Sequence, residues 1–182
     1  MGERALSEST FNAPAPERND PMSLPSSCDL CDAHRDDPSL RVLPPVFLAL
    51  GGAPSFAGPV STLQCFEDNT LLRAALETPG QGRVLVVDGG ASHRTALVGG
   101  KLAELAARNG WAGLVVDGCV RDRDEIAAFP IGVRALGLCP MPPAKRGAGQ
   151  RDVPVRVQGV PVQPGDWLLA DADGVILLGR AP

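Results

Sequence analysis

Two continuous apolar runs with an amphipathic segment between them constrain the fold of this chain most strongly. RVLVVD (83–88) and WAGLVVDG (111–118) are typical of strands that are buried on both faces. Between them, KLAELAARNG (101–110) places its apolar side chains on one helical face and offers Gly110 as a natural helix end. Two strands joined by a helix form a βαβ unit, so the centre of the chain is predicted to be α/β with a parallel strand pair.

The flanking segments extend this prediction. VSTLQCF (60–66) is a plausible strand, and NTLLRAAL (69–76) is a plausible helix with Asn69 as its N-cap. Beyond Pro140 the pattern turns to short apolar strands separated by Pro-Gly-Asp and Asp-Gly turns. We therefore expect a β-rich closing segment that packs against the α/β part.

Composition limits the possible partners. A chain of 182 residues with 44% hydrophobic side chains suits one domain with its own core. The net charge is −4, the seventeen basic residues are scattered, aromatics make up 4% and tyrosine is absent. Because nucleic acid is bound through clustered positive charge and stacking aromatics, we expect no direct nucleic-acid partner.

The ends and the cysteines indicate the compartment. Residues 1–27 are rich in proline, serine and charge, so they are predicted to be a disordered leader before a domain spanning 28–182, and Met22 is a possible true start. The leader lacks the apolar core of a signal peptide, and no apolar run approaches the roughly twenty residues that span a bilayer. With five cysteines, an odd number, we expect a reduced, cytoplasmic protein that has no disulfides and does not contact a membrane.

One strand-to-helix connection offers a backbone anion site. In α/β sheets ligands bind beyond the carboxyl ends of the strands, where helix N-termini expose unpaired N–H groups. Gly99, Gly100, Lys101 and Leu102 stand at such a helix start, and the glycines allow a carboxylate to approach the amides closely. The alternative is that the glycines form only a tight turn.

The next connection carries Arg121 and Asp122 side by side. An arginine can bind a carboxylate through two parallel hydrogen bonds, and an aspartate offers a hard oxygen to Mg²⁺ or Mn²⁺, which need few protein ligands. The alternative is that Asp122 is a helix N-cap whose charge Arg121 balances.

Several other features favour ordinary structural roles. Cys28 and Cys31 form a single CxxC without a second pair, and Asp171-Ala-Asp173-Gly174 lacks the remaining ligands of a calcium loop, so a hairpin turn is expected there. His93 stands alone in a polar segment. A basic loop around Lys145 could cover an anionic substrate, although a solvated loop is the default.

Five stretches together resemble one family, over roughly residues 26 to 180. It is the family that contains the regulator of ribonuclease activity A and the 4-hydroxy-4-methyl-2-oxoglutarate aldolases. The stretches are DLCDAH (29–34), CFEDN (65–69), LVGGKLAELAARNGWAGLVVDGCVRDRDEI (97–126), IGVRALG (131–137) and VPVRVQGVPVQPGDWLLADADGV (153–175).

The resemblance implies a β/β/α fold of swivelling-domain type, a single domain with mixed sheets and a central βαβ unit, assembled as a homotrimer. It also implies that the aldolases cleave a hydroxylated oxo-diacid into two pyruvates with a divalent metal, Mg²⁺ or Mn²⁺, and decarboxylate oxaloacetate. Carried over by motif, Arg121 would contact this small 2-oxo acid substrate and Asp122 would bind the metal. The amides of Gly99, Gly100, Lys101 and Leu102 would bind the substrate carboxylate.

One position departs from the family pattern. Many of the aldolases carry an aspartate separated by twenty residues from the Arg-Asp pair, and counting back from Arg121 reaches Gly100. The residues do not single out a general base either: Asp171, Asp173 and Glu67 are equal candidates.

Three functional hypotheses remain. The first is a metal-dependent lyase that performs aldol cleavage and decarboxylates oxaloacetate in a side reaction, which the presence of Asp122 favours. The second is a regulator that binds a ribonuclease without chemistry. The third is an enzyme of the same scaffold with another 2-oxo acid as its substrate.

Overall fold

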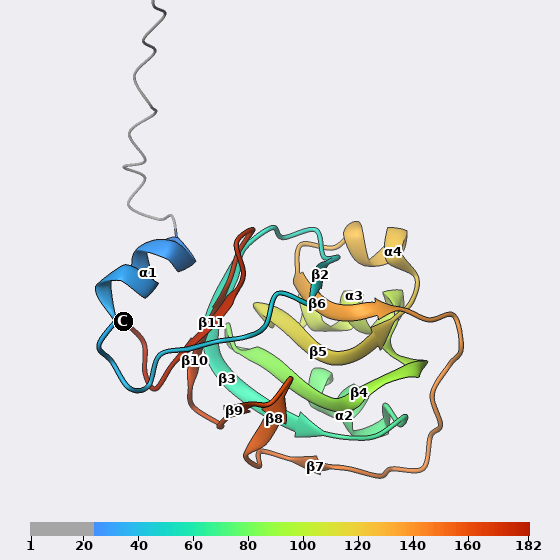
Figure 1. Ribbon diagram of the computed structural model, residues 1–182. Helices are drawn as coiled ribbons and strands as arrows, with labels where there is room; N and C mark the ends of the chain where they lie inside the picture. The colour runs from blue at the N-terminus through green and yellow to red at the C-terminus, as the bar shows by residue number, and fades with distance from the viewer. Residues whose placement is uncertain (1–23) are drawn as a thin grey trace, which may run out of the picture.

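A mixed nine-stranded sheet organises residues 24–182, the part of the chain that this computed structural model describes (Figure 1). The strands are β1 (Arg41–Val42), β2 (Leu48–Ala49), β3 (Phe56–Gln64), β4 (Val84–Val98), β5 (Gly113–Val120), β6 (Gly132–Leu138), β7 (Gln150–Arg151), β8 (Val155–Val157), β9 (Val160–Val162), β10 (Trp167–Ala170) and β11 (Val175–Leu178). The sheet order is β1-β11-β10-β3-β4-β5-β6-β2, with β7 paired to β3, while β8 and β9 form a separate hairpin.

Four short helices accompany the sheet. They are α1 (Ser27–Ala33), α2 (Thr70–Leu76), α3 (Gly100–Arg108) and α4 (Arg123–Ala127). In Figure 1, α2 and α3 lie behind the central strands, and the β8–β9 hairpin lies in front of them. Strands β4 and β5 are parallel and joined by α3, so the predicted βαβ unit and the mixed α/β fold class are confirmed.

The central strands are buried on both faces because each face has its own core. Leu85 and Val87 of β4 belong to the cluster that includes the helices, whereas Val84 and Val86 belong to the cluster that includes the β8–β10 segment. Every residue of β5 is buried. This two-sided burial is the physical reason for the continuous apolar runs in the sequence. The closing strands complete the layer, as expected, because β10 pairs with β3.

Strand β4 is longer than its apolar run. It was expected to end at residue 88 but extends to Val98, through the glycine-rich segment. Its pairing with β5 shifts register three times in this stretch, and Gly90 and Ala91 have positive φ values of 63° and 51°. Such bulges let a strand continue through residues that break regular alternation. The extension carries the chain directly to the start of α3.

Helix α2 begins where the sequence predicts, but its first turn is capped differently. Asn69 holds the N-cap position, yet its side chain donates to the Leu97 carbonyl 3.0 Å away instead of capping. Asp68 accepts a hydrogen bond from the Thr70 amide at 2.8 Å. Asn69 therefore ties α2 to the end of β4.

The beginning of the chain is described only in part. Residues 1–23, including Met22 and most of the predicted leader, lie outside the described residues. Ser27, the first residue of α1, is buried, and its amide and hydroxyl donate to the Asp171 carboxylate at 2.7 and 2.8 Å. Among residues 24–182, none of the helices has the length and apolar character needed to cross a membrane.

Candidate active site

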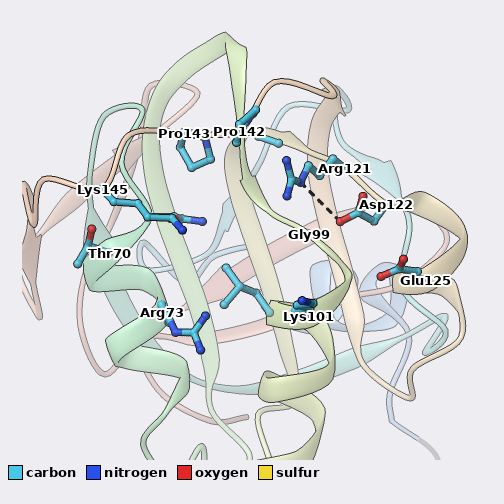
Figure 2. A pocket seen from close by; sticks show the side chains of 13 residues that line it. Thr70, Arg73, Gly99, Lys101, Arg121, Asp122, Glu125, Pro142, Pro143 and Lys145 are labelled. Carbon is cyan, nitrogen blue, oxygen red and sulfur yellow. Dashed lines mark ion pairs between the residues drawn. The ribbon is translucent and has the colours of Figure 1, made fainter.

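A cavity of about 690 Å³ opens where the β4–α3 and β5–α4 connections meet. Figure 2 shows Arg121, Asp122 and Glu125 on one side of it, with Arg73 and Lys145 on the opposite side. The lining residues are Asn69, Thr70, Arg73, Ala96, Gly99, Lys101, Leu102, Arg121, Asp122, Glu125, Pro142, Pro143 and Lys145. The cavity lies at the carboxyl ends of two parallel strands, where α/β proteins generally bind their ligands.

The side chain of Asp122 links the β5–α4 connection to the start of α3. Its Oδ2 accepts a hydrogen bond from the Gly100 amide at 3.1 Å. Asp122 also holds the N-cap position of α4, but its side chain makes no capping hydrogen bond there. Its backbone is left-handed, with φ 60° and ψ 48°, a conformation that costs free energy for a residue other than glycine and is concentrated at functional sites. With this backbone conformation, the Asp122 side chain makes its hydrogen bond to α3 and none to its own helix, α4.

The two glycines leave room for two carboxylates. A Cβ added to Gly99 would lie 2.6 Å from Asp122 Oδ2, and one added to Gly100 would lie 2.0 Å from Glu125 Oε2. Both distances are far below a normal contact, so larger residues at these positions would displace the acids. The α3 N-terminus, where the helix dipole favours negative charge, therefore faces both acids.

Arg121 is anchored by its backbone and extends its side chain into the cavity (Figure 2). Its amide donates to the Val98 carbonyl at 2.9 Å, which joins the two loops. Its Nε lies 3.6 Å from Asp122 Oδ2, and its side chain is 41% exposed. The terminal guanidinium nitrogens are thus placed to bind a carboxylate in the cavity.

Positive charge outweighs negative charge around the cavity. Arg73, Lys101, Arg121 and Lys145 line it together with two acids, Asp122 and Glu125. Arg73 also pairs with Glu77 on its own helix, through an Nε–Oε1 distance of 3.0 Å. The remaining cations, Lys101, Arg121 and Lys145, still outnumber the two acids, so the cavity favours an anionic ligand.

The predicted site residues are brought together. Gly99, Lys101, Leu102, Arg121 and Asp122 all line the cavity, and the amide of Gly100 contacts Asp122. Two of the four amides predicted to bind a carboxylate already have partners within the protein. The Gly100 amide donates to Asp122 Oδ2, and the Leu102 amide donates to the Gly99 carbonyl at 3.0 Å. The basic loop also contributes, because Lys145 reaches the cavity wall.

Sequence reasoning missed two charged lining residues, Arg73 and Glu125. Arg73 lies one helical turn after Asn69, and the same helix presents both side chains to the cavity. Glu125 lies three residues after Asp122, which is also about one helical turn. A helical reading of the segment after Asp122 could have identified Glu125 as a neighbour of that residue.

The three acidic residues considered as general bases lie away from this cavity in the described part of the chain. The Asp171 carboxylate binds Ser27 and the turn that begins at Asp171, and that turn is the expected hairpin connection between β10 and β11. Glu67 accepts hydrogen bonds from Arg94 and Ser92, both at 2.6 Å, and these bonds hold the pKa of its carboxyl below the usual value. Asp173 follows Asp171 in the exposed turn.

The remaining metal-binding candidates do not form a cluster. Among residues 24–182, no group of three or more His, Cys, Asp or Glu side chains is arranged to hold a metal ion. Cys28 and Cys31 are free, and His93 Nδ1 lies 3.6 Å from Cys119 Sγ, outside the cavity lining. A metal site at the cavity would therefore have at most two protein carboxylates, Asp122 and Glu125, together with water and substrate.

Asp122 fits that role chemically. The Gly100 amide and Arg121 Nε both lie near Oδ2 of Asp122. The other oxygen, Oδ1, has no polar partner among the described residues. Mg²⁺ prefers carboxylate oxygen and keeps several of its waters, so one such ligand together with a chelating substrate is a reasonable donor set.

Comparisons with known proteins point to one family. The sequence model of the RraA-like family, described as Aldolase/RraA, matches residues 27–177. A protein of Albidiferax ferrireducens (strain ATCC BAA-621 / DSM 15236 / T118), named "Putative 4-hydroxy-4-methyl-2-oxoglutarate aldolase", is 56% identical over 162 residues, which cover 84% of this chain and 94% of that protein. A protein of the same name from Burkholderia mallei (strain SAVP1) is 59% identical over 155 residues, with the same two coverages.

A solved structure is similarly close. The structure of the RNA-processing inhibitor RraA from Thermus thermophilis superposes with a TM-score of 0.84 and 51% sequence identity, covering 88% of this chain and 96% of that chain. The family match spans most of the chain, and the curated relatives are more than half identical to it. The chain therefore belongs to the RraA-like family.

Proposed function

We propose that the protein is a divalent-metal-dependent lyase that cleaves 4-hydroxy-4-methyl-2-oxoglutarate into two pyruvates and decarboxylates oxaloacetate as a secondary reaction. The observation that carries the proposal is the placement of Arg121 and Asp122 in one cationic cavity, with Asp122 held by the Gly100 amide. The names of the relatives that are 56% and 59% identical to this chain support the same reaction.

The charges of the cavity suit an oxo-diacid. A substrate with two carboxylates carries two negative charges, and the cavity is lined by four cationic and two anionic side chains. Arg121 binds the carboxylate next to the 2-oxo group through its planar fork, and the N-terminus of α3 adds a favourable potential. Lys145, on the opposite wall, binds the distal carboxylate.

Asp122 would hold the metal ion, Mg²⁺ or Mn²⁺, through Oδ1. When bound, the ion acts as a Lewis acid that stabilises the negative charge developing as the carbon–carbon bond breaks. The hydrogen bond from the Gly100 amide fixes the position of Asp122. Arg121, whose Nε lies 3.6 Å from Asp122 Oδ2, would hold the substrate carboxylate beside the metal.

The proposal is tested by following pyruvate release from both substrates with Mg²⁺ or Mn²⁺, and again after addition of a chelator. Asp122→Asn keeps the size of the side chain and an acceptor for the Gly100 amide but removes the anionic oxygen. We expect this variant to lose metal-dependent turnover while it remains folded. Asp124→Asn is the matched control, because Asp124 is an exposed acid on α4 that does not line the cavity. Full activity of the Asp122 variant would refute the metal assignment.

A second candidate function rests on the solved structure of the RNA-processing inhibitor RraA. In that case the chain would bind a ribonuclease and reduce its activity without performing chemistry. A ribonuclease assay with the purified protein, run beside the lyase assay, separates the two functions. Inhibition that survives Asp122→Asn, together with no turnover of either substrate, would favour the regulator.

The assembly is part of the same proposal. We expect a homotrimer, for which light scattering coupled to size exclusion should give three times the mass of the 182-residue chain. A monomer in solution that remains fully active would contradict this expectation.

A further inference from the structure

The loop between β6 and β7 brings Lys145 to the cavity and is fastened to the segment that begins α2. The Ala144 amide donates to the Glu67 carbonyl at 2.8 Å. The Gly147 amide donates to Thr70 Oγ1 at 3.3 Å. Lys145 lies between these two attachments, and Figure 2 shows its side chain directed into the cavity. The placement of Lys145 therefore depends on how firmly the loop is held.

A buried carboxylate adds a third attachment. Asp68 is 1% exposed, and its Oδ1 accepts a hydrogen bond from the Thr70 amide at 2.8 Å. Its Oδ2 accepts from the amide of Arg146, the residue directly after Lys145. Burial alone would raise the pKa of Asp68, but hydrogen bonds from the amides of Thr70, Arg146 and Ala148 hold that pKa below its usual value. The ionised carboxylate thus binds the first turn of α2 and the loop together.

The charge of Asp68 is balanced by backbone amides. Among residues 24–182, Asp68 forms no ion pair with a lysine, arginine or histidine side chain. An acid that only capped α2 would need the amides of that helix alone, whereas Asp68 also binds an amide 78 positions away. Hydrogen bonds to a charged group are roughly twice as strong as neutral ones. Removal of this charge should therefore release the loop.

We propose that Asp68 is a positioning residue, which holds the 144–148 loop against α2 and thereby sets Lys145 at the distal carboxylate of the oxo-diacid. The role rests on the lyase function proposed above, in which Arg121 binds the carboxylate next to the 2-oxo group. Asp68 is buried and does not line the cavity, so it acts on the substrate only through Lys145. It should affect recognition of the distal carboxylate and leave recognition of the first carboxylate unchanged.

The hold on the loop is tested without any substrate. Trypsin cleaves after Lys145 and Arg146, which are exposed, but it needs a loop that has left its attachments. In Asp68→Asn an NH₂ group replaces one acceptor oxygen and faces a backbone donor. We expect cleavage at these two sites, identified by mass spectrometry, to be at least about tenfold faster than in wild type. Asp124→Asn is the matched control and should be cut at the wild-type rate. An equal rate in Asp68→Asn would show that Asp68 does not hold the loop.

The effect on recognition is tested with two acids that share a 2-oxo acid head. 2-Oxoglutarate has a distal carboxylate and lacks the hydroxyl that cleavage requires, whereas 2-oxobutyrate has no second carboxylate. In calorimetric titrations with Mg²⁺ present, Asp68→Asn should bind 2-oxoglutarate about tenfold more weakly and 2-oxobutyrate within about twofold of wild type. Lys145→Ala should show the same selective loss. The double variant should lose no more than Lys145→Ala alone, because both changes remove one interaction.

A milder pair of variants asks the same question if Asp68→Asn does not fold. Thr70→Val keeps the shape of the side chain but removes the acceptor for the Gly147 amide. It should raise trypsin cleavage after Lys145 by about threefold, as expected for the loss of one neutral hydrogen bond. Thr70→Ser keeps the hydroxyl and should protect the loop as wild type does. Identical cleavage of the two variants would count against the attachment of the loop to α2.

The binding results separate this role from the lyase function. Equal weakening of both acids in Asp68→Asn, or additive losses in the double variant, would show that Asp68 does not act through Lys145. Pyruvate release by a wild-type protein that binds 2-oxoglutarate no more tightly than 2-oxobutyrate would overturn the role of Asp68 and leave the lyase intact. If wild-type protein binds neither acid and releases no pyruvate, the lyase function fails, and the role of Asp68 in substrate recognition fails with it.

Discussion

The amide of Gly100 donates a hydrogen bond to Asp122 Oδ2 over 3.1 Å, although 22 positions separate the two residues in the sequence. The bond joins the two strand-to-helix connections that form the cavity. It is possible because Gly99, the neighbouring residue, has no side chain: a Cβ there would lie 2.6 Å from the same oxygen. The position of the carboxylate thus depends on a small residue as much as on the hydrogen bond.

Gly99→Ala should therefore reduce activity without unfolding the protein. The added methyl group displaces the Asp122 carboxylate, which is 38% exposed and free to swing toward solvent. We expect kcat/KM for both substrates to fall by about tenfold or more, since small misplacements of a site residue are costly. The thermal midpoint should change by only a few degrees. Gly174→Ala, where an added Cβ meets nothing within 4 Å, is the matched control. Unchanged turnover would show that the position of Asp122 is not critical.

Arg121→Lys tests the bidentate grip on the substrate. Lysine keeps the positive charge near Asp122 but loses the planar fork that binds a carboxylate through two hydrogen bonds. We expect kcat/KM to fall by about tenfold to 100-fold in both reactions, which steady-state kinetics can measure. Equal losses in cleavage and decarboxylation would agree with binding of the shared 2-oxo acid group. An unchanged kcat/KM would mean that Arg121 does not touch the substrate.

The sequence could predict the βαβ unit, since burial on both faces requires continuous apolar runs and those runs are visible without a structure. It also placed Arg121 and Asp122 at the end of a buried strand, because the change from apolar to polar residues marks that end. Both predictions depend on local pattern alone.

The features that the sequence could not reveal depend on contacts between distant segments. The extension of β4 to Val98 requires bulged pairing with β5, which no periodicity records. The Glu125 side chain lies where a Cβ on Gly100 would stand, and this close approach arises only when α3 and α4 pack together. For the same reason, only the fold reveals that Asp171, Asp173 and Glu67, the bases considered from the sequence, do not line the cavity.

Phe56 gives a prediction about stability. Its ring lies over two glycines of adjacent parallel strands, so that a Cβ on Gly132 or Gly113 would lie 1.8 or 2.1 Å from a ring carbon. Phe56 is 3% exposed and cannot swing away without disrupting the core. We expect Gly132→Ala to lower the free energy of unfolding by about 1–3 kcal/mol, as overpacking generally does. Urea denaturation beside Gly174→Ala measures the difference, and an unaffected midpoint would mean that the sheet yields at this point.

Asp171 gives a prediction about pH. Burial alone would raise the pKa of its carboxyl, but hydrogen bonds from Ser27, Asp173 and Gly174 outweigh that effect and hold the pKa below its usual value. A lowered pKa in the folded state means that the ionised group stabilises the fold above the unfolded pKa, and that this stability is lost as pH falls through the folded pKa. Asp171→Asn should therefore lower the free energy of unfolding by about 2–3 kcal/mol at neutral pH, because hydrogen bonds to a charged group are lost. The difference from wild type should shrink on acidification.

Asp173→Asn, in the same exposed turn, is the control for charge alone. Urea titrations at several pH values measure both variants, and a difference that is constant with pH would show that the Asp171 charge does not stabilise the junction with α1.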